Sequence, residues 1–128
     1  KWFQETPSDF IFSVKVSRYI THIKRLKEIE KPWQVFIQNA SELKEKLGPL
    51  LLQFPPSFKA EKENIKRLEN FLKIAVKSEK RLAMEFRHLS WSRSEIYNLL
   101  KKYQVGWVIA DSSRYPKTEK ATTDFVYI

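Results

Sequence analysis

Cysteine is absent from the 128-residue sequence, and only two glycines are present. The lack of cysteine excludes disulfides, thiolate zinc sites and cysteine nucleophiles for this stretch, and it favours a cytoplasmic location. No apolar run approaches the roughly 20 residues that a membrane-spanning helix needs, and no signal-peptide core is apparent, so we expect no membrane association. No His-x-x-x-His spacing, glycine-rich phosphate loop or serine nucleophile elbow occurs, so the sequence predicts no specific cofactor or metal site.

What the chain does have is a large apolar and aromatic content. Apolar residues make up 42% of it, and it contains four Trp, five Tyr and nine Phe. This composition suffices for the core of one domain. The sequence opens without Met, inside what resembles the end of a helix at residues 1–5, so we expect it to be part of a longer protein.

The charge is strongly positive, with a formal net charge of +9 at pH 7. One interpretation is an anionic partner such as nucleic acid, phosphate or a membrane surface. The other is that most lysines lie on solvated outer faces of helices, because in the predicted helices they alternate with glutamates. We favour the second interpretation for most of the charge, and nucleic acid is therefore the less favoured partner.

Short apolar runs alternate with segments of helical periodicity. Strands are predicted where such runs end at turn signals, at residues 10–16, 50–54, 81–87, 107–111 and 124–128. Apolar residues at helical spacing predict helices at 32–47, closed by Gly48 and Pro49, and at 65–75. A third helix is predicted to start at a capping box, Ser92 to Glu95, and to end near Gly106. Residues 17–31 form a polar stretch between the first strand and the first helix.

This alternation is typical of right-handed βαβ units and a parallel sheet. Two architectures fit: an open doubly wound sheet, or consecutive βα units of a TIM-type (β/α)8 barrel. In each strand one set of alternating positions is apolar and the other is partly polar, mostly near the C-terminal end. This favours the barrel, because the polar set would converge at the top of one lumen. We therefore predict an α/β fold in which the chain covers about five parallel strands of such a barrel.

Several short motifs follow one another along nearly the whole chain: 6–10 (TPSDF), 12–15 (FSVK), 18–22 (RYITH), 46–49 (KLGP), 52–58 (LQFPPSF), 85–88 (EFRH) with Trp91, 110–112 (ADS) and 121–127 (ATTDFVY). Together they closely resemble the YecE-like family, also called domain of unknown function seventy-two. The resemblance implies a TIM-barrel protein of unassigned activity. It also implies that the chain spans the third to seventh strands of that barrel.

Candidate site residues are the polar and aromatic ones at the predicted strand ends. Glu85, Asp111 and His88 are the candidate catalytic residues. The candidate substrate-binding residues are Lys15, Arg18, His22, Gln53, Arg87, Trp91 and Tyr127.

Structural alternatives stay open for several of these residues. Glu85 is either an acid or base or one half of a structural ion pair with Arg87, and Lys15 is either an anion anchor or a salt-bridge partner of Glu85. Asp111 has the alternative task of capping a turn, and Trp91 that of core packing.

These residues predict an enzyme that acts on an anionic or phosphorylated small molecule at the C-terminal mouth of the barrel. A nucleic-acid-binding or processing protein that uses its basic surface is the alternative from a different class. A barrel that binds a ligand without catalysis is the third. No metal is predicted, and the cofactor is left open.

Overall fold

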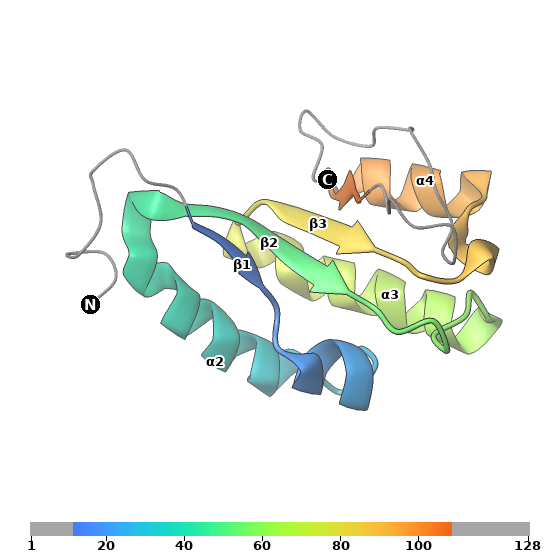
Figure 1. The fold of residues 1–128 in the computed structure, drawn as a ribbon, viewed down its shortest axis with the longest axis horizontal. Coiled ribbons are helices and arrows are strands. Elements are labelled where there is room, and N and C mark those ends of the chain that lie inside the picture. The colour runs from blue at the N-terminus through green and yellow to red at the C-terminus, as the bar shows by residue number, and fades with distance from the viewer. Residues whose placement is uncertain (1–11, 109–128) are drawn as a thin grey trace.

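The computed structural model describes residues 12–108, and its centre is a sheet of four strands in the order β1-β2-β3-β4. All neighbouring strands are parallel, and each pairs with the next along the chain (Figure 1). The prediction of parallel neighbours in sequence order is confirmed for these strands, and the strand predicted at 124–128 lies outside the described residues. The strands are β1 (Phe12–Lys15), β2 (Leu47–Gln53), β3 (Leu82–Glu85) and β4 (Gly106–Trp107).

Helical segments connect the successive strands, so the described chain has an α/β fold with a parallel sheet. A five-residue π-helix, η1 (Tyr19–Ile23), follows the C-terminal end of β1 in the stretch that the sequence showed only as polar. Within the described part of the chain, no helix has the length and apolar character needed to cross a membrane. The remaining helices are α2 (Glu30–Ala40), η2 (Ser41–Lys46), α3 (Lys62–Ala75), η3 (Val76–Ser78), η4 (Leu89–Trp91) and α4 (Ser94–Lys102).

The predicted apolar side of the strands forms the core against the helices. Leu50 and Leu52 of β2 and Met84 of β3 are fully buried, in one cluster with Leu68 and Leu72 of α3. The opposite side of β1 is exposed at Ser13 and Lys15, and β2 alternates between buried and half-buried positions. The predicted two-sided character is therefore present in β1 and β2, whereas all four residues of β3 are buried.

Stacked aromatic rings lie beneath the loops that follow β2 and β3. Phe86 stacks on Phe54 at a centroid distance of 5.1 Å and on Trp91 at 4.4 Å. Phe58 stacks on Phe54 at 5.0 Å and on Trp91 at 5.1 Å. Each such pair contributes about 0.5–1.5 kcal/mol beyond the area it buries. The loops that extend from the two central strands thus rest on a rigid base.

The predicted helix at 32–47 ends earlier than expected. Lys44 adopts φ 51° inside η2 and breaks the helical path. β2 then begins at Leu47, so Gly48 and Pro49 lie within the strand and do not close the helix. A proline is tolerated at this position because it comes early in the strand, and the next N–H, that of Leu50, donates to the carbonyl oxygen of Arg81, the residue before β3.

The predicted capping box at Ser92 is also wrong, because the preceding helix η4 uses the same serine. Ser92 is the C-cap of η4, and its backbone N–H donates to the carbonyl oxygen of Leu89. It therefore cannot be the N-cap of α4, a position that Arg93 takes without a side-chain cap. At the other end, Gln104 takes the left-handed conformation with φ 55°, while Gly106 is already the first residue of β4.

Candidate functional site

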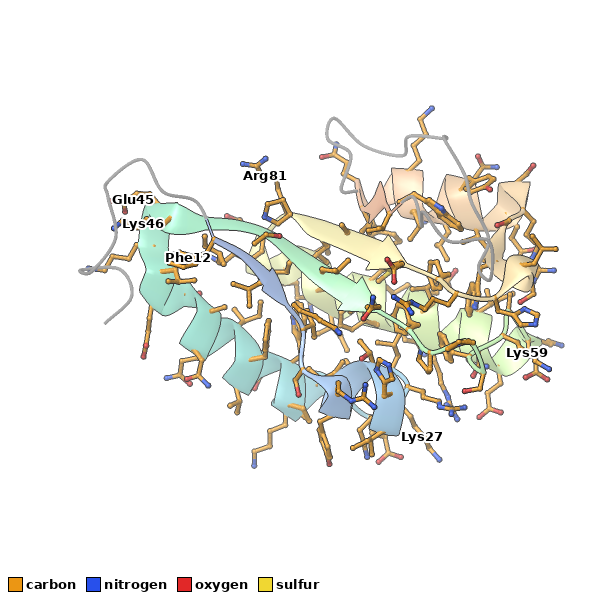
Figure 2. All side chains as sticks on the ribbon, viewed as in Figure 1. Phe12, Lys27, Glu45, Lys46, Lys59 and Arg81 are labelled. Atoms are coloured by element: carbon orange, nitrogen blue, oxygen red, sulfur yellow. The ribbon has the colours of Figure 1, made fainter. Side chains whose placement is uncertain are left out.

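The candidate site lies where the parallel strands end. Lys15, Gln53 and Glu85 are the last residues of β1, β2 and β3, and the strand register places Gln53 directly beside Glu85. In Figure 2 the loops that carry Lys27 and Lys59 lie beyond these strand ends, at the opposite end of the sheet from Lys46. Carboxyl ends of parallel strands are where α/β proteins place their ligands, because the connecting loops leave a crevice there.

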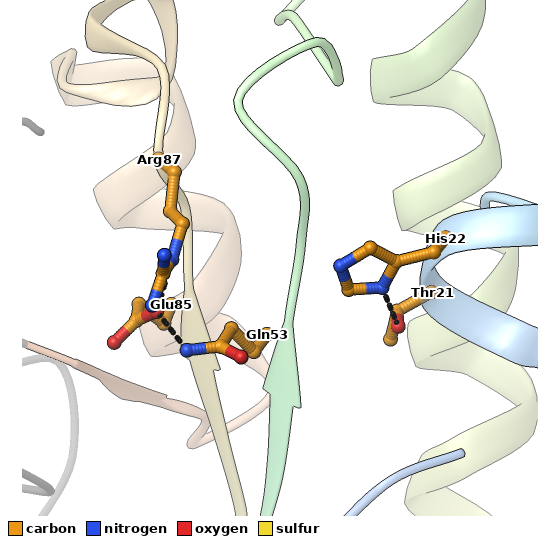
Figure 3. A network of polar contacts seen from close by, with 5 residues as sticks. All are labelled: Thr21, His22, Gln53, Glu85 and Arg87. Carbon is orange, nitrogen blue, oxygen red and sulfur yellow. Dashed lines mark hydrogen bonds and ion pairs between the residues drawn. The ribbon is translucent and has the colours of Figure 1, made fainter. Parts of the chain in front are cut away.

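Glu85 is held by two donors on a single oxygen. Arg87 Nε and Gln53 Nε2 each donate to Glu85 Oε2 at 2.7 Å (Figure 3). The side chains of Glu85 and Arg87 are 12% and 27% exposed, so the ion pair is largely shielded from solvent. No described residue donates to Glu85 Oε1. The carboxylate is thus held in orientation by two donors on one of its oxygens.

Lys15 does not form the salt bridge with Glu85 that the sequence left open as an alternative. Among residues 12–108, Glu85 pairs with Arg87, and no ion pair links Lys15 or Arg18 to a carboxylate. Both cations are exposed. Neither cation is therefore neutralised by a carboxylate among the residues that the structure describes.

His22 faces these groups from η1, across the end of β2. Its Nδ1 lies 2.8 Å from the hydroxyl oxygen of Thr21, which is fully buried. Figure 3 shows the imidazole ring projecting from η1 toward β2, on the side of Gln53 away from Glu85. π-Helical turns are rare and frequently occur at functional sites. Here the turn presents Thr21 toward the interior and His22 toward the strand ends.

Burial and four cations lower the pKa of His22. Burial first, and then the positive charges of Arg18, Lys15, Arg87 and Arg25, lower the pKa of His22 below the ordinary value of 6.5. The imidazole is therefore neutral at neutral pH, because each of these charges disfavours a further proton. The same convergence of cations creates a positive potential that attracts anions.

Arg25 is positioned by contacts that sequence reasoning missed. Its Nη2 donates to Ser57 Oγ at 2.9 Å, and its Nε donates to the carbonyl oxygen of His22 at 3.3 Å. Arg25, Leu26 and Glu28 all have positive φ, at 49°, 64° and 49°. Such conformations are costly for residues other than glycine and cluster at ligand sites. No glycine in the sequence marks the positive φ angles, and no local pattern marks the Arg25–Ser57 contact, because Ser57 lies on a different loop.

Two predicted site residues, Trp91 and His88, make structural contacts. Trp91 is fully buried in the aromatic stack, and its Nε1 donates to the carbonyl oxygen of Phe58 at 2.6 Å, which fits the alternative of core packing. His88 is the N-cap of η4, where its Nδ1 accepts the backbone N–H of Ser90 at 3.1 Å. Ser90 Oγ in turn accepts the backbone N–H of Ala60 at 2.7 Å.

Comparison with known proteins shows the family of the chain. The family model described as a protein of unknown function, DUF72, matches residues 1–128. The chain belongs to the DUF72 family. The resemblance to the YecE-like family is thereby confirmed, since the two names denote one family. No protein among those with curated descriptions is significantly similar to the chain.

Solved structures of DUF72 proteins share the fold. A DUF72 family protein of Thermotoga maritima is 32% identical, with a TM-score of 0.77 over 97% of this chain and 50% of that one. A DUF72 family protein of Enterococcus faecalis is 23% identical, with a TM-score of 0.78 over 95% of this chain and 49% of that one. The chain therefore spans about half the length of these relatives.

The remaining predicted residues of this DUF72 chain, Asp111 and Tyr127, lie outside the described residues and stay predictions. Within residues 12–108, no group of three or more histidine, aspartate or glutamate side chains is arranged to hold a metal ion. The described site therefore consists of one oriented carboxylate, an amide, a neutral imidazole and four cations.

Proposed function

We propose that the chain is part of a TIM-type (β/α)8 barrel enzyme that acts on an anionic or phosphorylated small molecule at the C-terminal ends of its strands. Four parallel strands in chain order, without a switch point, support the barrel. So does the open, polar side of β1, which in a barrel would face the lumen.

The convergence of Lys15, Arg18, Arg25 and Arg87 on His22 carries the proposal. These cations come from the end of β1, from the N-cap of η1, from the turn after η1 and from the loop after β3, so they act together on His22 only in the folded chain. Four like charges repel one another, and Arg87 is the one that has a described carboxylate partner. A bound anion would relieve this repulsion, and clustered cations are how proteins bind phosphate and carboxylate groups.

Glu85 is the group proposed to transfer a proton. Its Oε2 is occupied by Gln53 and Arg87, which hold the carboxylate plane, and its Oε1 faces no described donor. A general base needs this combination of a fixed orientation and one open oxygen. Asp111, predicted at the end of the next strand, is the candidate for the second carboxylate.

Charge on the helices argues against the nucleic-acid alternative. On α3, Arg67 pairs with Glu63 at 2.8 Å and Lys73 pairs with Glu69 at 3.8 Å, each four residues apart. Such pairs are typical of solvated helix faces and reduce the positive charge that α3 offers to a phosphate backbone.

A thermal-shift screen of the intact protein with sugar phosphates and nucleotides tests the proposal. Ligand at about one hundred times its dissociation constant should add about 2.7 kcal/mol of stability. Lys15→Met should remove most of this ligand-dependent stabilisation while leaving the unliganded melting temperature nearly unchanged. Lys66→Met, which makes the same charge change on an exposed position of α3, is the control and should behave like the wild type.

One combination of results would contradict the proposed function. If no anionic small molecule stabilises the protein, and DNA or RNA binds tightly with an affinity that falls steeply with salt, the nucleic-acid alternative replaces the proposal.

A further inference from the structure

The hydroxyl group of Thr21 decides where the proton of His22 resides. Thr21 is fully buried, and from the described residues its hydroxyl contacts one polar atom, His22 Nδ1, at 2.8 Å. A buried hydroxyl that leaves its proton without an acceptor costs about 1–3 kcal/mol. The Thr21 hydroxyl therefore donates to Nδ1, so this nitrogen carries a lone pair. In a neutral imidazole the proton is then on Nε2.

The protonated nitrogen faces the candidate site. In Figure 3 the second ring nitrogen of His22 points away from Thr21 and toward the end of β2. No described residue accepts a hydrogen bond from Nε2. An N–H donor among cations, aimed at the strand ends, is suited to an oxygen that carries negative charge.

We propose that His22 binds an oxygen of an anionic ligand as a hydrogen-bond donor through Nε2, and that Thr21 is the positioning residue that keeps the proton off Nδ1. This inference rests on the proposed anionic ligand and assigns it a contact. The ligand group is one with acceptor oxygens and at least one negative charge, such as a phosphoryl, sulfuryl or carboxylate group.

The charges around the ring give this contact a pH dependence. Arg18 and Arg25 flank His22 along the chain, Lys15 faces it from the end of β1, and Arg87 from the loop after β3, where Glu85 is its partner. In the free protein these cations and burial lower the pKa of His22. A bound dianion offsets them and raises that pKa, because it favours the imidazolium. Binding is then coupled to proton uptake, and the anion binds more tightly as pH falls from the raised pKa of the complex to the lowered pKa of the free protein.

Sulfate is the appropriate probe, because its charge stays constant between pH 8 and pH 5.5, whereas that of phosphate does not. Titration of the intact protein with sulfate should show saturable binding that tightens several-fold between these pH values, since each unit of pKa difference corresponds to about a tenfold change in affinity. His22→Gln retains an N–H donor but cannot take up a proton. It should bind sulfate with an affinity that no longer depends on pH.

Thr21→Val tests the positioning role, because valine keeps the shape of threonine without the hydroxyl group. We expect nitrogen NMR of the wild-type imidazole to show the Nε2–H tautomer, and the Thr21→Val variant to show a mixture of the two tautomers. Sulfate affinity at pH 8 should fall in that variant in proportion to the fraction of rings that leave the Nε2–H tautomer, by about twofold for an equal mixture. Lys66→Met is again the control and should leave the pH dependence unchanged.

The outcomes separate the two proposals. If the wild type does not bind sulfate saturably, the anion site is wrong, and the proposed function fails with it. If sulfate binding is lost in Lys15→Met but keeps its affinity and pH dependence in His22→Gln, only the role of His22 is overturned. An Nδ1–H tautomer in the wild type would also overturn this inference alone.

Discussion

Two histidine regions of this chain are alike in their local contacts and different in their surroundings. His22 Nδ1 lies 2.8 Å from the hydroxyl of Thr21, and His88 Nδ1 lies 2.9 Å from the hydroxyl of Ser90. His88 is tied into the fold, because it also caps η4, and Ser90 binds the backbone of Ala60 on the loop after β2. Among the described residues no hydrogen bond ties the His22 ring to another loop, and burial and four cations lower its pKa.

The comparison shows that a histidine with a hydroxyl neighbour is not by itself a functional sign. At His88 the pair joins the two loops above the aromatic stack, so its effect is on stability. At His22 the pair fixes the direction of a donor that lies in the field of four cations, so its effect should be on binding. The surrounding charges, which arrive from distant segments, distinguish the two.

The largest expected effect is on the free energy of unfolding, in the aromatic stack below the His88 loop. Trp91→Ala should cost about 3–5 kcal/mol of unfolding free energy, because it empties a fully buried volume and removes the bond to Phe58. Denaturant unfolding measures this loss. Leu89→Ala, two residues away and 71% exposed, is the control and should change stability by less than about 0.5 kcal/mol. A small stability loss in Trp91→Ala together with lost ligand binding would return Trp91 to the pocket wall.

On the functional side, Glu85→Gln should reduce turnover on the order of 100-fold or more, with little change in melting temperature. Glutamine keeps the shape and can still accept the bonds from Gln53 and Arg87 on one oxygen, so the fold is preserved while the base is lost. Steady-state kinetics on a substrate from the thermal-shift screen checks this. Retained activity would make Glu85 structural, and Asp111 would be the next carboxylate to test.

The smallest expected effect separates the two histidines. His88→Ala should destabilise the protein by about 1 kcal/mol, because it removes the cap of η4, and should leave sulfate affinity unchanged. His88→Asn should recover most of this loss, since asparagine is a good N-cap residue. Thermal unfolding and sulfate titration of both variants measure it. A marked loss of sulfate affinity in His88→Ala would end the contrast with His22.

The sheet could be predicted from the sequence because the apolar residues of its strands recur at alternating positions. Alternating apolar positions in β1, β2 and β3 define which side meets the helices, and parallel order follows from strand and helix alternation. The pairing of Gln53 with Glu85 then follows from register, since both residues end their strands. Parts of the site that depend on strand ends were thus predictable.

The other parts depend on contacts between segments, which no local pattern encodes. Arg25 and Ser57 are 32 residues apart, and the positive φ angles near Arg25 occur without glycine. The capping box at Ser92 failed because a preceding short helix claimed the same residue. Such competition is resolved only by tertiary packing.

The central claim is that cations from separate segments converge on a neutral His22 and make an anion site. A pH titration of the His22 imidazole by NMR in the intact protein, assigned by comparison with His22→Gln, tests it most directly. The account predicts a midpoint below 6.5 that rises when Lys15 or Arg18 is changed to methionine, and rises again in the wild type when sulfate is added. A midpoint at or above 6.5 that responds to neither change would contradict it.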